Sequence, residues 1–282
     1  MTYQLGLIGY PIKHSLSPWI HREFLKRAGL IGSYDLIEIH PTDSFSERIS
    51  ALKESGIHGF NVTVPYKQTI INHLDQLNEQ AEKIGAVNTV LHENGQWIGY
   101  NTDGIGYVRS LEHAFGDLVA SNKTERFLII GAGGAARGIY VALASSGIQT
   151  IDIANRTVEN AREIVKTKPQ GTSTKVMTID EAARVLNQYK VIIQTTSVGM
   201  KPHEEQLIMN VERMREGSIA SDIVYQPIKT KFLKEAKKKG ASIHFGHTML
   251  LHQAQYAFEI WTGNKVSTKG MDQQLQRILE EG

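Results

Sequence analysis

The sequence predicts an α/β protein of two domains, the second of which is a Rossmann-type, doubly wound sheet. Strand-like and helix-like segments alternate along most of the chain, which is typical of a parallel sheet covered by helices. An apolar strand also runs directly into a glycine-rich turn at Gly131-Ala132-Gly133-Gly134-Ala135. With 282 residues, the chain exceeds the usual size of one domain. We expect an N-terminal α/β domain over residues 1–102, completed by helices within 247–282, and the Rossmann-type domain over 103–246.

The first hundred residues alternate between the two kinds of segment. Strands are expected at 5–8, 34–39, 58–64, 86–92 and 96–100. The first helix should begin at Ser17-Pro18, because proline is favoured in the first helical turn. The next should follow Ser44, which has the capping-box spacing to Glu47. Asn94-Gly95 predicts a tight hairpin between the last two strands.

The second part of the chain has a more regular rhythm. A helix is expected over 104–115, followed by a polar, linker-like stretch. Strands are expected at 127–130, 150–154, 176–178, 191–194, 219–224 and 242–245. Helical segments separate them, and two further helices are expected at 250–261 and 272–279.

Composition excludes several classes of function. The 31 basic and 29 acidic residues give a net charge of +2, which provides no electrostatic argument for nucleic-acid or membrane partners. The chain has no cysteine, which excludes disulfides and thiolate chemistry. We see neither a signal peptide nor a membrane span and expect a soluble, cytoplasmic protein. His244, His247 and His252 lie close in sequence but lack acidic partners at metal-site spacing, so no metal site is expected.

A polar strand end in the first domain suggests a binding site. Asn61 and Thr63 are two residues apart, so on a strand their side chains share one face. Pro65 should end the strand, and Lys67 should reach the same edge from the next turn. This arrangement suits a small polyhydroxylated ligand. A solvated strand edge is the alternative that the segment alone leaves open.

The glycine-rich turn has the residue types that a dinucleotide site needs. Gly131 permits a tight turn, Gly133 lets the backbone approach a pyrophosphate, and Ala136 lets the following helix pack near the strand. The start of that helix offers free N–H groups and positive partial charge to phosphates. A glycine fingerprint alone is a weak signal. This one lies between an apolar strand and a helix, so we predict dinucleotide binding.

The end of the next strand indicates which dinucleotide binds. An NAD site usually has an acidic residue there, which bonds the ribose 2′-hydroxyl. Here the strand ends at Asn155-Arg156-Thr157, and the rival acid Asp152 lies inside the strand. A guanidinium can bind a 2′-phosphate through paired, charge-assisted hydrogen bonds. The sequence therefore favours NADP, with a solvated Arg156 as the alternative.

Taken together, these segments resemble the shikimate dehydrogenase family over essentially the whole chain. The matching motifs lie at 9–18, 59–67, 85–89, 101–104, 131–135, 155–157, 196–200, 222–225 and 246–253. The chain departs from the family pattern at Gln226, at Thr248 and at Gln194-Thr195, all on the expected cofactor side. None of these departures removes a group that the resemblance makes catalytic.

The resemblance implies NADP-linked, reversible interconversion of shikimate and 3-dehydroshikimate in aromatic amino-acid biosynthesis. It implies Lys67 and Asp103 as the catalytic pair, both in contact with the substrate. Further substrate contacts would be Ser15 and Ser17, which bind the carboxylate, and Thr63, Asn88, Tyr225 and Gln253. Cofactor contacts would be Gly131, Ala132, Gly133, Gly134, Ala135, Asn155, Arg156 and Thr157. Ile223 and Gly246 would lie near the nicotinamide, and Glu79 would be one more cofactor contact.

Elementary chemistry agrees with these roles. Reduction of a ketone needs a hydride at carbon and a proton at oxygen, which an ammonium such as that of Lys67 can supply. A carboxylate at Asp103 would hold the lysine, but an opposite charge favours the protonated amine whereas burial favours the neutral one. A surface ion pair is the alternative for these two residues. Ser17 is equally well placed as an ordinary helix N-cap.

Two other functions remain open on the sequence. One is a quinate/shikimate dehydrogenase that uses NAD, which Arg156 argues against. The other is a metabolite sensor without catalysis, which has no need of both Lys67 and Asp103. We expect the active site in the cleft between the two domains. The sequence does not determine the oligomeric state, and a homodimer is one option.

Overall fold

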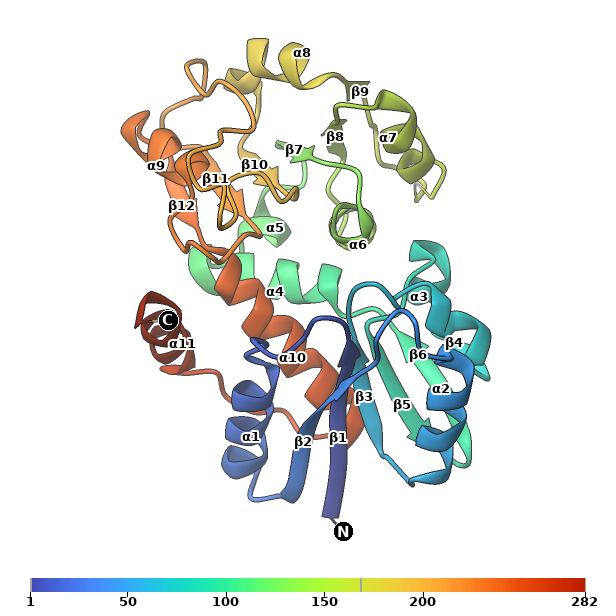
Figure 1. Ribbon diagram of the computed structural model, residues 1–282. Coiled ribbons are helices and arrows are strands. Elements are labelled where there is room, and N and C mark those ends of the chain that lie inside the picture. Colours follow the sequence, from blue (N-terminus) through green and yellow to red (C-terminus); the bar gives the residue numbers. More distant parts are fainter. Residues whose placement is uncertain (1, 168, 282) are drawn as a thin grey trace. The chain divides into compact units, whose positions relative to one another are not determined.

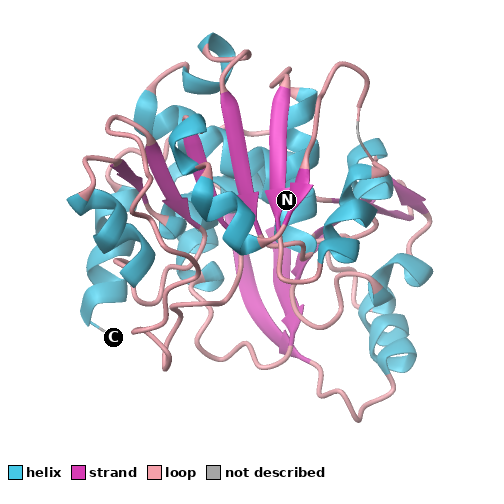
Figure 2. Cartoon of the chain, turned by 90° about the horizontal axis from the view of Figure 1, so that it is seen from above, coloured by secondary structure: helices cyan, strands magenta, loops and turns pink. Residues whose placement is uncertain are grey.

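The computed structural model describes residues 2–167 and 169–281, which form two compact units. The first unit comprises Met1–Thr102 and Gln253–Thr268, and the second comprises Asp103–His252 and Lys269–Gly282. Each unit contains a six-stranded sheet with helices against it (Figures 1 and 2). The predicted α/β fold class is therefore confirmed. The C-terminal segment that we expected to complete the first domain is shared, since the last helix belongs to the second unit.

The first unit has a mixed sheet in the order β2-β1-β3-β5-β6-β4. Its elements are β1 (Thr2–Gly9), α1 (Ser17–Ala28), β2 (Ile31–Glu38), α2 (Phe45–Glu54), β3 (Gly59–Val62), the 3₁₀ helix η1 (Thr69–His73), β4 (Gln76–Leu77), α3 (Glu79–Ile84), β5 (Thr89–Glu93) and β6 (Gln96–Tyr100). β1 pairs in parallel with β2 and β3, whereas β5 is antiparallel to both β3 and β6. Helix α10 (Gly246–Thr262) begins in the second unit and ends in the first.

Side chains of β1 point alternately to the two faces of this sheet and contribute to a hydrophobic core on each face. Leu5 and Leu7 pack with Trp261 from the C-terminal part of α10. Ile8 points to the other face and packs with Ile49 of α2 and with residues of η1 and α3. The period of two expected for a strand thus explains why both faces are covered by helices.

The structure confirms one local prediction for the first unit and changes two others. The hairpin between β5 and β6 is confirmed, with Asn94 and Gly95 at φ 51° and 78°, the left-handed values of a tight hairpin turn. Ser44 caps α2 by accepting from the Glu47 amide at 3.4 Å, but the reciprocal bond of a capping box is not formed there. β3 ends at Val62, two residues before the predicted end, because the chain enters a turn at Thr63.

The second unit has an entirely parallel sheet in the order β12-β11-β10-β7-β8-β9. Its elements are α4 (Asp103–Phe115), α5 (Leu118–Ser121), β7 (Arg126–Ile130), α6 (Gly134–Ser145), β8 (Thr150–Ala154), α7 (Val158–Val165), β9 (Val176–Met177), α8 (Ile179–Arg184), the 3₁₀ helix η2 (Leu186–Gln188), β10 (Val191–Gln194), β11 (Ile219–Asp222), α9 (Lys231–Lys238), β12 (Ser242–His244) and α11 (Met271–Glu281). This is the Rossmann order, and the chain reverses direction across the sheet between β7 and β10. In such sheets, ligands bind at the carboxyl ends of the strands on either side of that reversal.

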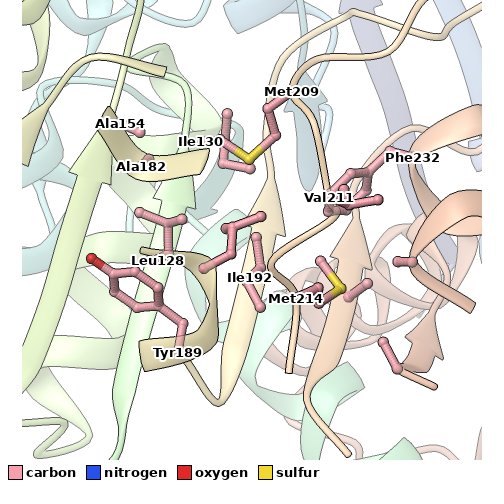
Figure 3. Close-up of a cluster of buried hydrophobic side chains, with 14 of the residues drawn as sticks. Leu128, Ile130, Ala154, Ala182, Tyr189, Ile192, Met209, Val211, Met214 and Phe232 are labelled. Atoms are coloured by element: carbon pink, nitrogen blue, oxygen red, sulfur yellow. The ribbon is translucent and has the colours of Figure 1, made fainter. Parts of the chain in front are cut away.

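One face of this sheet carries an apolar core. Leu128 and Ile192 on the central strands pack with Tyr189, Met209 and Phe232 (Figure 3). The central strands are apolar along their whole length because helices also cover the opposite face of the sheet. There α4 and α6 pack so closely that a Cβ added at Gly104 would collide with the Gly138 carbonyl.

Candidate active site

The glycine-rich turn lies at the reversal point of the second unit. Gly131 follows β7 directly with φ 116°, which favours glycine, and an added Cβ would collide with the Thr195 side chain just beyond β10. Gly133 and Gly134 are exposed, and apart from the adjacent residues and the backbone of α6 itself, no described atom lies within 4 Å of a Cβ built on either. Gly133 caps α6 without any side-chain hydrogen bond. The first turn of α6 can therefore offer its N–H groups to a pyrophosphate.

The tip of β8 presents the predicted basic group. The Asn155 side chain donates to the Thr157 carbonyl at 2.8 Å and closes the turn that follows the strand. Arg156, between them, is exposed, and within the described residues no carboxylate pairs with it. A free guanidinium at this position can bind a 2′-phosphate.

Asp152, the rival acid, is fully engaged inside the sheet. The residue is 1 % exposed, and its side chain accepts hydrogen bonds from the Arg126 guanidinium, the Tyr189 hydroxyl at 2.8 Å and the Lys175 amide at 2.7 Å. A carboxylate with three internal donors does not serve a ribose hydroxyl. The structure thus removes the acidic feature that would have favoured NAD.

The residues expected near the nicotinamide lie against each other. A Cβ at Gly246, the first residue of α10, would collide with the Ile223 carbonyl, so only glycine allows this backbone approach. Asp222 braces the same loop, because it accepts from the Val224 amide at 2.9 Å and the Thr230 hydroxyl at 2.6 Å. Burial raises the pKa of Asp222 to about 7, and these hydrogen bonds oppose the rise.

A buried polar network occupies the predicted substrate side of the first unit. Asn88 is 3 % exposed; its Oδ1 accepts from the Thr102 amide at 2.8 Å and its Nδ2 donates to the Thr102 hydroxyl at 3.0 Å. The Thr102 hydroxyl in turn bonds Gln253 at 3.3 Å. Two of the expected substrate contacts, Asn88 and Gln253, are therefore joined through one threonine.

The predicted catalytic pair, Lys67 and Asp103, is connected to this network along the chain. The Lys67 carbonyl accepts from the Val87 amide at 2.8 Å, which holds the lysine beside Asn88. Asp103 is 8 % exposed, begins α4 and directly follows Thr102. The backbones of Lys67 and Asp103 are thus each anchored within one residue of the Asn88–Thr102 contact.

The serine pair is arranged differently from the expected helix cap. Leu16 is the N-cap of α1 and Ser17 is already its first residue, so the N-cap expectation for Ser17 is wrong. The Ser15 hydroxyl accepts from the Ser17 amide at 3.2 Å. Thr63 follows β3, and its side chain packs so closely on Gly9 that any larger residue at Gly9 would displace it.

Two predicted contacts remain, Tyr225 for the substrate and Glu79 for the cofactor. Tyr225 is half-buried in the loop after β11, and burial raises its pKa. Glu79 begins α3 in the first unit and forms an exposed ion pair with Lys83 at 2.6 Å. The Lys83 contact lowers the pKa of Glu79.

Asn61 corrects one sequence expectation. Its side chain is 5 % exposed and accepts from the Tyr34 hydroxyl at 2.7 Å, while its amide donates to the Asn88 carbonyl at 3.1 Å. It therefore does not present its amide to a ligand beside Thr63. Sequence reasoning also missed Thr102, although a threonine directly before the proposed catalytic aspartate was visible in the motif.

His244, one of the three clustered histidines, has internal hydrogen-bond partners. His244 is buried between the Ser221 hydroxyl at 2.8 Å and the Thr248 hydroxyl at 3.1 Å, and burial lowers its pKa to about 3. Within residues 2–167 and 169–281, no group of three or more acidic, histidine or cysteine side chains is arranged to hold a metal ion. Over the same residues, no helix is both long and apolar enough to cross a bilayer.

The Rossmann-ordered sheet, its glycine turn and the free arginine define a dehydrogenase that takes a phosphorylated dinucleotide. Three family models match the chain: the shikimate dehydrogenase substrate binding domain at residues 7–90, shikimate / quinate 5-dehydrogenase at 113–226, and the shikimate 5′-dehydrogenase C-terminal domain at 246–276. The chain belongs to the shikimate dehydrogenase family.

Individual relatives cover nearly the full length. The chain is 53 % identical over 280 residues to a shikimate dehydrogenase (NADP(+)) of Oceanobacillus iheyensis, covering 99 % of both proteins. A crystal structure of shikimate dehydrogenase with NADP+ matches with a TM-score of 0.88 and 38 % identity, covering 99 % of this chain and 96 % of that one. The Thermus thermophilus enzyme with NADP(H) and shikimate matches with a TM-score of 0.85 and 31 % identity, covering 98 % and 99 %.

Proposed function

We propose that this protein catalyses the reversible, NADP-dependent interconversion of shikimate and 3-dehydroshikimate. The observation that carries the proposal is the full-length relationship to NADP(+)-dependent shikimate dehydrogenases, at up to 53 % identity. The buried Asn88–Thr102 contact supports it, because Asp103 directly follows Thr102 and the Lys67 backbone bonds the residue before Asn88. The first unit would bind the substrate and the second would bind NADP.

The substrate would be held by groups from several parts of the first unit. Ser15 and Ser17 lie at the start of α1, where the helix dipole and the hydroxyls favour a carboxylate. Thr63, Asn88 and Gln253 would bind the ring hydroxyls by hydrogen bonds. Tyr225, on the loop after β11, is the remaining substrate contact that we propose.

Lys67 would transfer the proton in this reaction. When NADPH is bound, it supplies the hydride to the ketone carbon. The Lys67 ammonium donates its proton to the ketone oxygen, and in the reverse direction the neutral amine accepts the hydroxyl proton. The Asp103 carboxylate would orient the amine and accept a hydrogen bond from the neighbouring ring hydroxyl.

NADP would be selected at the tip of β8. Arg156 would bind the 2′-phosphate, with Asn155 and Thr157 shaping the turn around it. The amides at 131–135 would bind the pyrophosphate, and Ile223 and Gly246 would pack near the nicotinamide. Glu79 is the weakest of these assignments, because its carboxylate already pairs with Lys83.

Initial rates with two substrates and two cofactors test the proposal. Formation of the reduced cofactor, NADPH or NADH, is followed by absorbance with shikimate or quinate, and with NADP+ or NAD+ at equal concentration. We expect kcat/KM to be highest for shikimate with NADP+, and lower by at least about tenfold with NAD+ because the 2′-phosphate contact is lost. Saturable shikimate binding without turnover would identify a sensor instead.

Quinate is the second candidate substrate because one matching family model covers shikimate and quinate dehydrogenases together. Quinate keeps the carboxylate and ring hydroxyls that the first unit would bind. A kcat/KM for quinate equal to that for shikimate would replace our assignment with the broader one.

Two finer expectations from the sequence accompany this proposal. We infer a cytoplasmic location from the biosynthetic role, which fractionation of the source cells would test. A homodimer would have twice the chain mass of 31.4 kDa, and light scattering after size-exclusion chromatography distinguishes it from a monomer.

A further inference from the structure

We propose that Tyr34 is a positioning residue whose hydroxyl holds Asn61, and thereby orients Asn88 and Gln253 in the shikimate site. The inference rests on the proposed function. It adds a residue of β2 that touches neither the substrate nor the cofactor in our assignment.

Tyr34 carries its hydroxyl into an apolar core. The residue is 0 % exposed, its ring stacks on His21 with centroids 4.3 Å apart, and it packs with Leu5, Leu7 and Trp261. A phenylalanine would fill the same space. A tyrosine there is therefore explained by what its hydroxyl bonds, since a buried hydroxyl without partners is costly.

The partner of this hydroxyl is the Asn61 amide. The Tyr34 hydroxyl donates to Asn61 Oδ1 at 2.7 Å, and Asn61 Nδ2 donates to the Asn88 carbonyl at 3.1 Å and the Thr89 hydroxyl at 3.0 Å. The hydroxyl thus specifies which end of the amide faces β5. Without it, Oδ1 is a buried acceptor that has lost its donor.

The bonds continue from Asn61 to the predicted substrate contacts. The Thr89 hydroxyl donates to Asn88 Oδ1 at 3.1 Å and lies 3.3 Å from the Thr102 hydroxyl. Asn88 and Thr102 hold each other, and Thr102 bonds Gln253. A change at Tyr34 can therefore reach Asn88 and Gln253 through hydrogen bonds alone.

Steady-state kinetics of Tyr34→Phe test the inference, with shikimate and NADP+ varied separately. We expect the KM for shikimate to rise about tenfold, with the KM for NADP+ within twofold of wild type. Tyr66→Phe is the matched control, because the Tyr66 hydroxyl also makes a single buried bond in the first unit, to the Ile39 carbonyl at 2.8 Å. It should leave both KM values within twofold.

A double-mutant cycle with Asn61→Leu separates coupling from a general packing effect. If Tyr34 acts through Asn61, the two effects on the KM for shikimate are less than additive. Full additivity, an unchanged KM in Y34F, or an equal rise of both KM values would overturn the inference. If Y34F does not fold by circular dichroism, Asn61→Leu replaces it, and a shikimate KM within twofold of wild type would overturn the inference.

The wild-type rate distinguishes this inference from the proposed function. An active wild type with an unaffected Y34F would refute only the role of Tyr34. A wild type that does not oxidise shikimate with NADP+ would refute the function and this inference together.

Discussion

At the scale of single residues, hydrogen bonds inside the fold decide which polar groups remain available to a ligand. Asp152 and Asn61 are both engaged by buried partners, whereas Arg156 is left exposed at the end of a strand. The position of Arg156 was predictable, because a strand tip follows from local sequence. The engagement of Asn61 was not, since its partner Tyr34 is 27 residues away on another strand.

Arg156→Ala should impair the use of NADP more than the use of NAD. Loss of a charge-assisted contact to the 2′-phosphate should raise the KM for NADP+ by about 10- to 100-fold and leave the KM for NAD+ within about twofold. Initial rates with each cofactor measure the effect. Arg184→Ala, an exposed arginine on α8, is the control. Equal effects on both cofactors would remove Arg156 from 2′-phosphate recognition.

His21 should make the protein sensitive to mild acid. Burial lowers its pKa from 6.5 to about 3, so the folded state requires the neutral ring. The contribution to stability is complete above the unfolded pKa of 6.5 and is lost as the pH falls from there toward 3. At pH 5 the loss is about 2 kcal/mol in the free energy of unfolding.

His21→Phe retains the stack on Tyr34 and should reduce the loss of stability between pH 7 and pH 5 by about that amount. Urea unfolding at both pH values measures it. His203→Phe, at an exposed position, should retain the wild-type pH dependence. An H21F protein as acid-sensitive as wild type would show that His21 is not the titrating group.

At the scale of elements, the ends of strands were harder to predict than the strands themselves. Asn94-Gly95 specifies its hairpin locally, and the apolar run of β7 specifies a buried strand. β3 ends two residues before its predicted end, and β2 begins at Ile31 rather than at the predicted residue 34. Pairing with β1, rather than side-chain type, determines where these strands start and stop. The close contact of α4 with α6 at Gly104 is likewise invisible until the helices are packed.

Asp222 should be essential to the loops that follow β10 and β11. It accepts from the Val224 amide, the Thr230 hydroxyl and the Gln194 amide, so Asp222→Ala leaves three buried donors without an acceptor. We expect a loss of about 2–4 kcal/mol in the free energy of unfolding. Asp222→Asn keeps an oxygen for two of these donors and should lose less than half as much. Equal losses in the two variants would show that the hydrogen bonds are not responsible.

At the scale of the whole molecule, the account depends on residues that the chain distributes between two units. Lys67 lies in the first unit and Asp103 is the first residue of the second, yet both are anchored next to the Asn88–Thr102 contact. Motif order along the chain was sufficient to identify the family. It could not reveal this anchoring, because Asn88 and Thr102 are brought together only when β5 pairs with β6.

The most direct test of the central claim is the turnover of Lys67→Ala, measured together with its binding of shikimate. If the Lys67 amine transfers the proton, kcat should fall by about 10³-fold while the Kd for shikimate, from calorimetry, stays within about fivefold. Lys53→Ala, an exposed lysine on α2, should retain the wild-type kcat. A K67A protein with kcat within tenfold of wild type would contradict the assignment of the proton-transfer group.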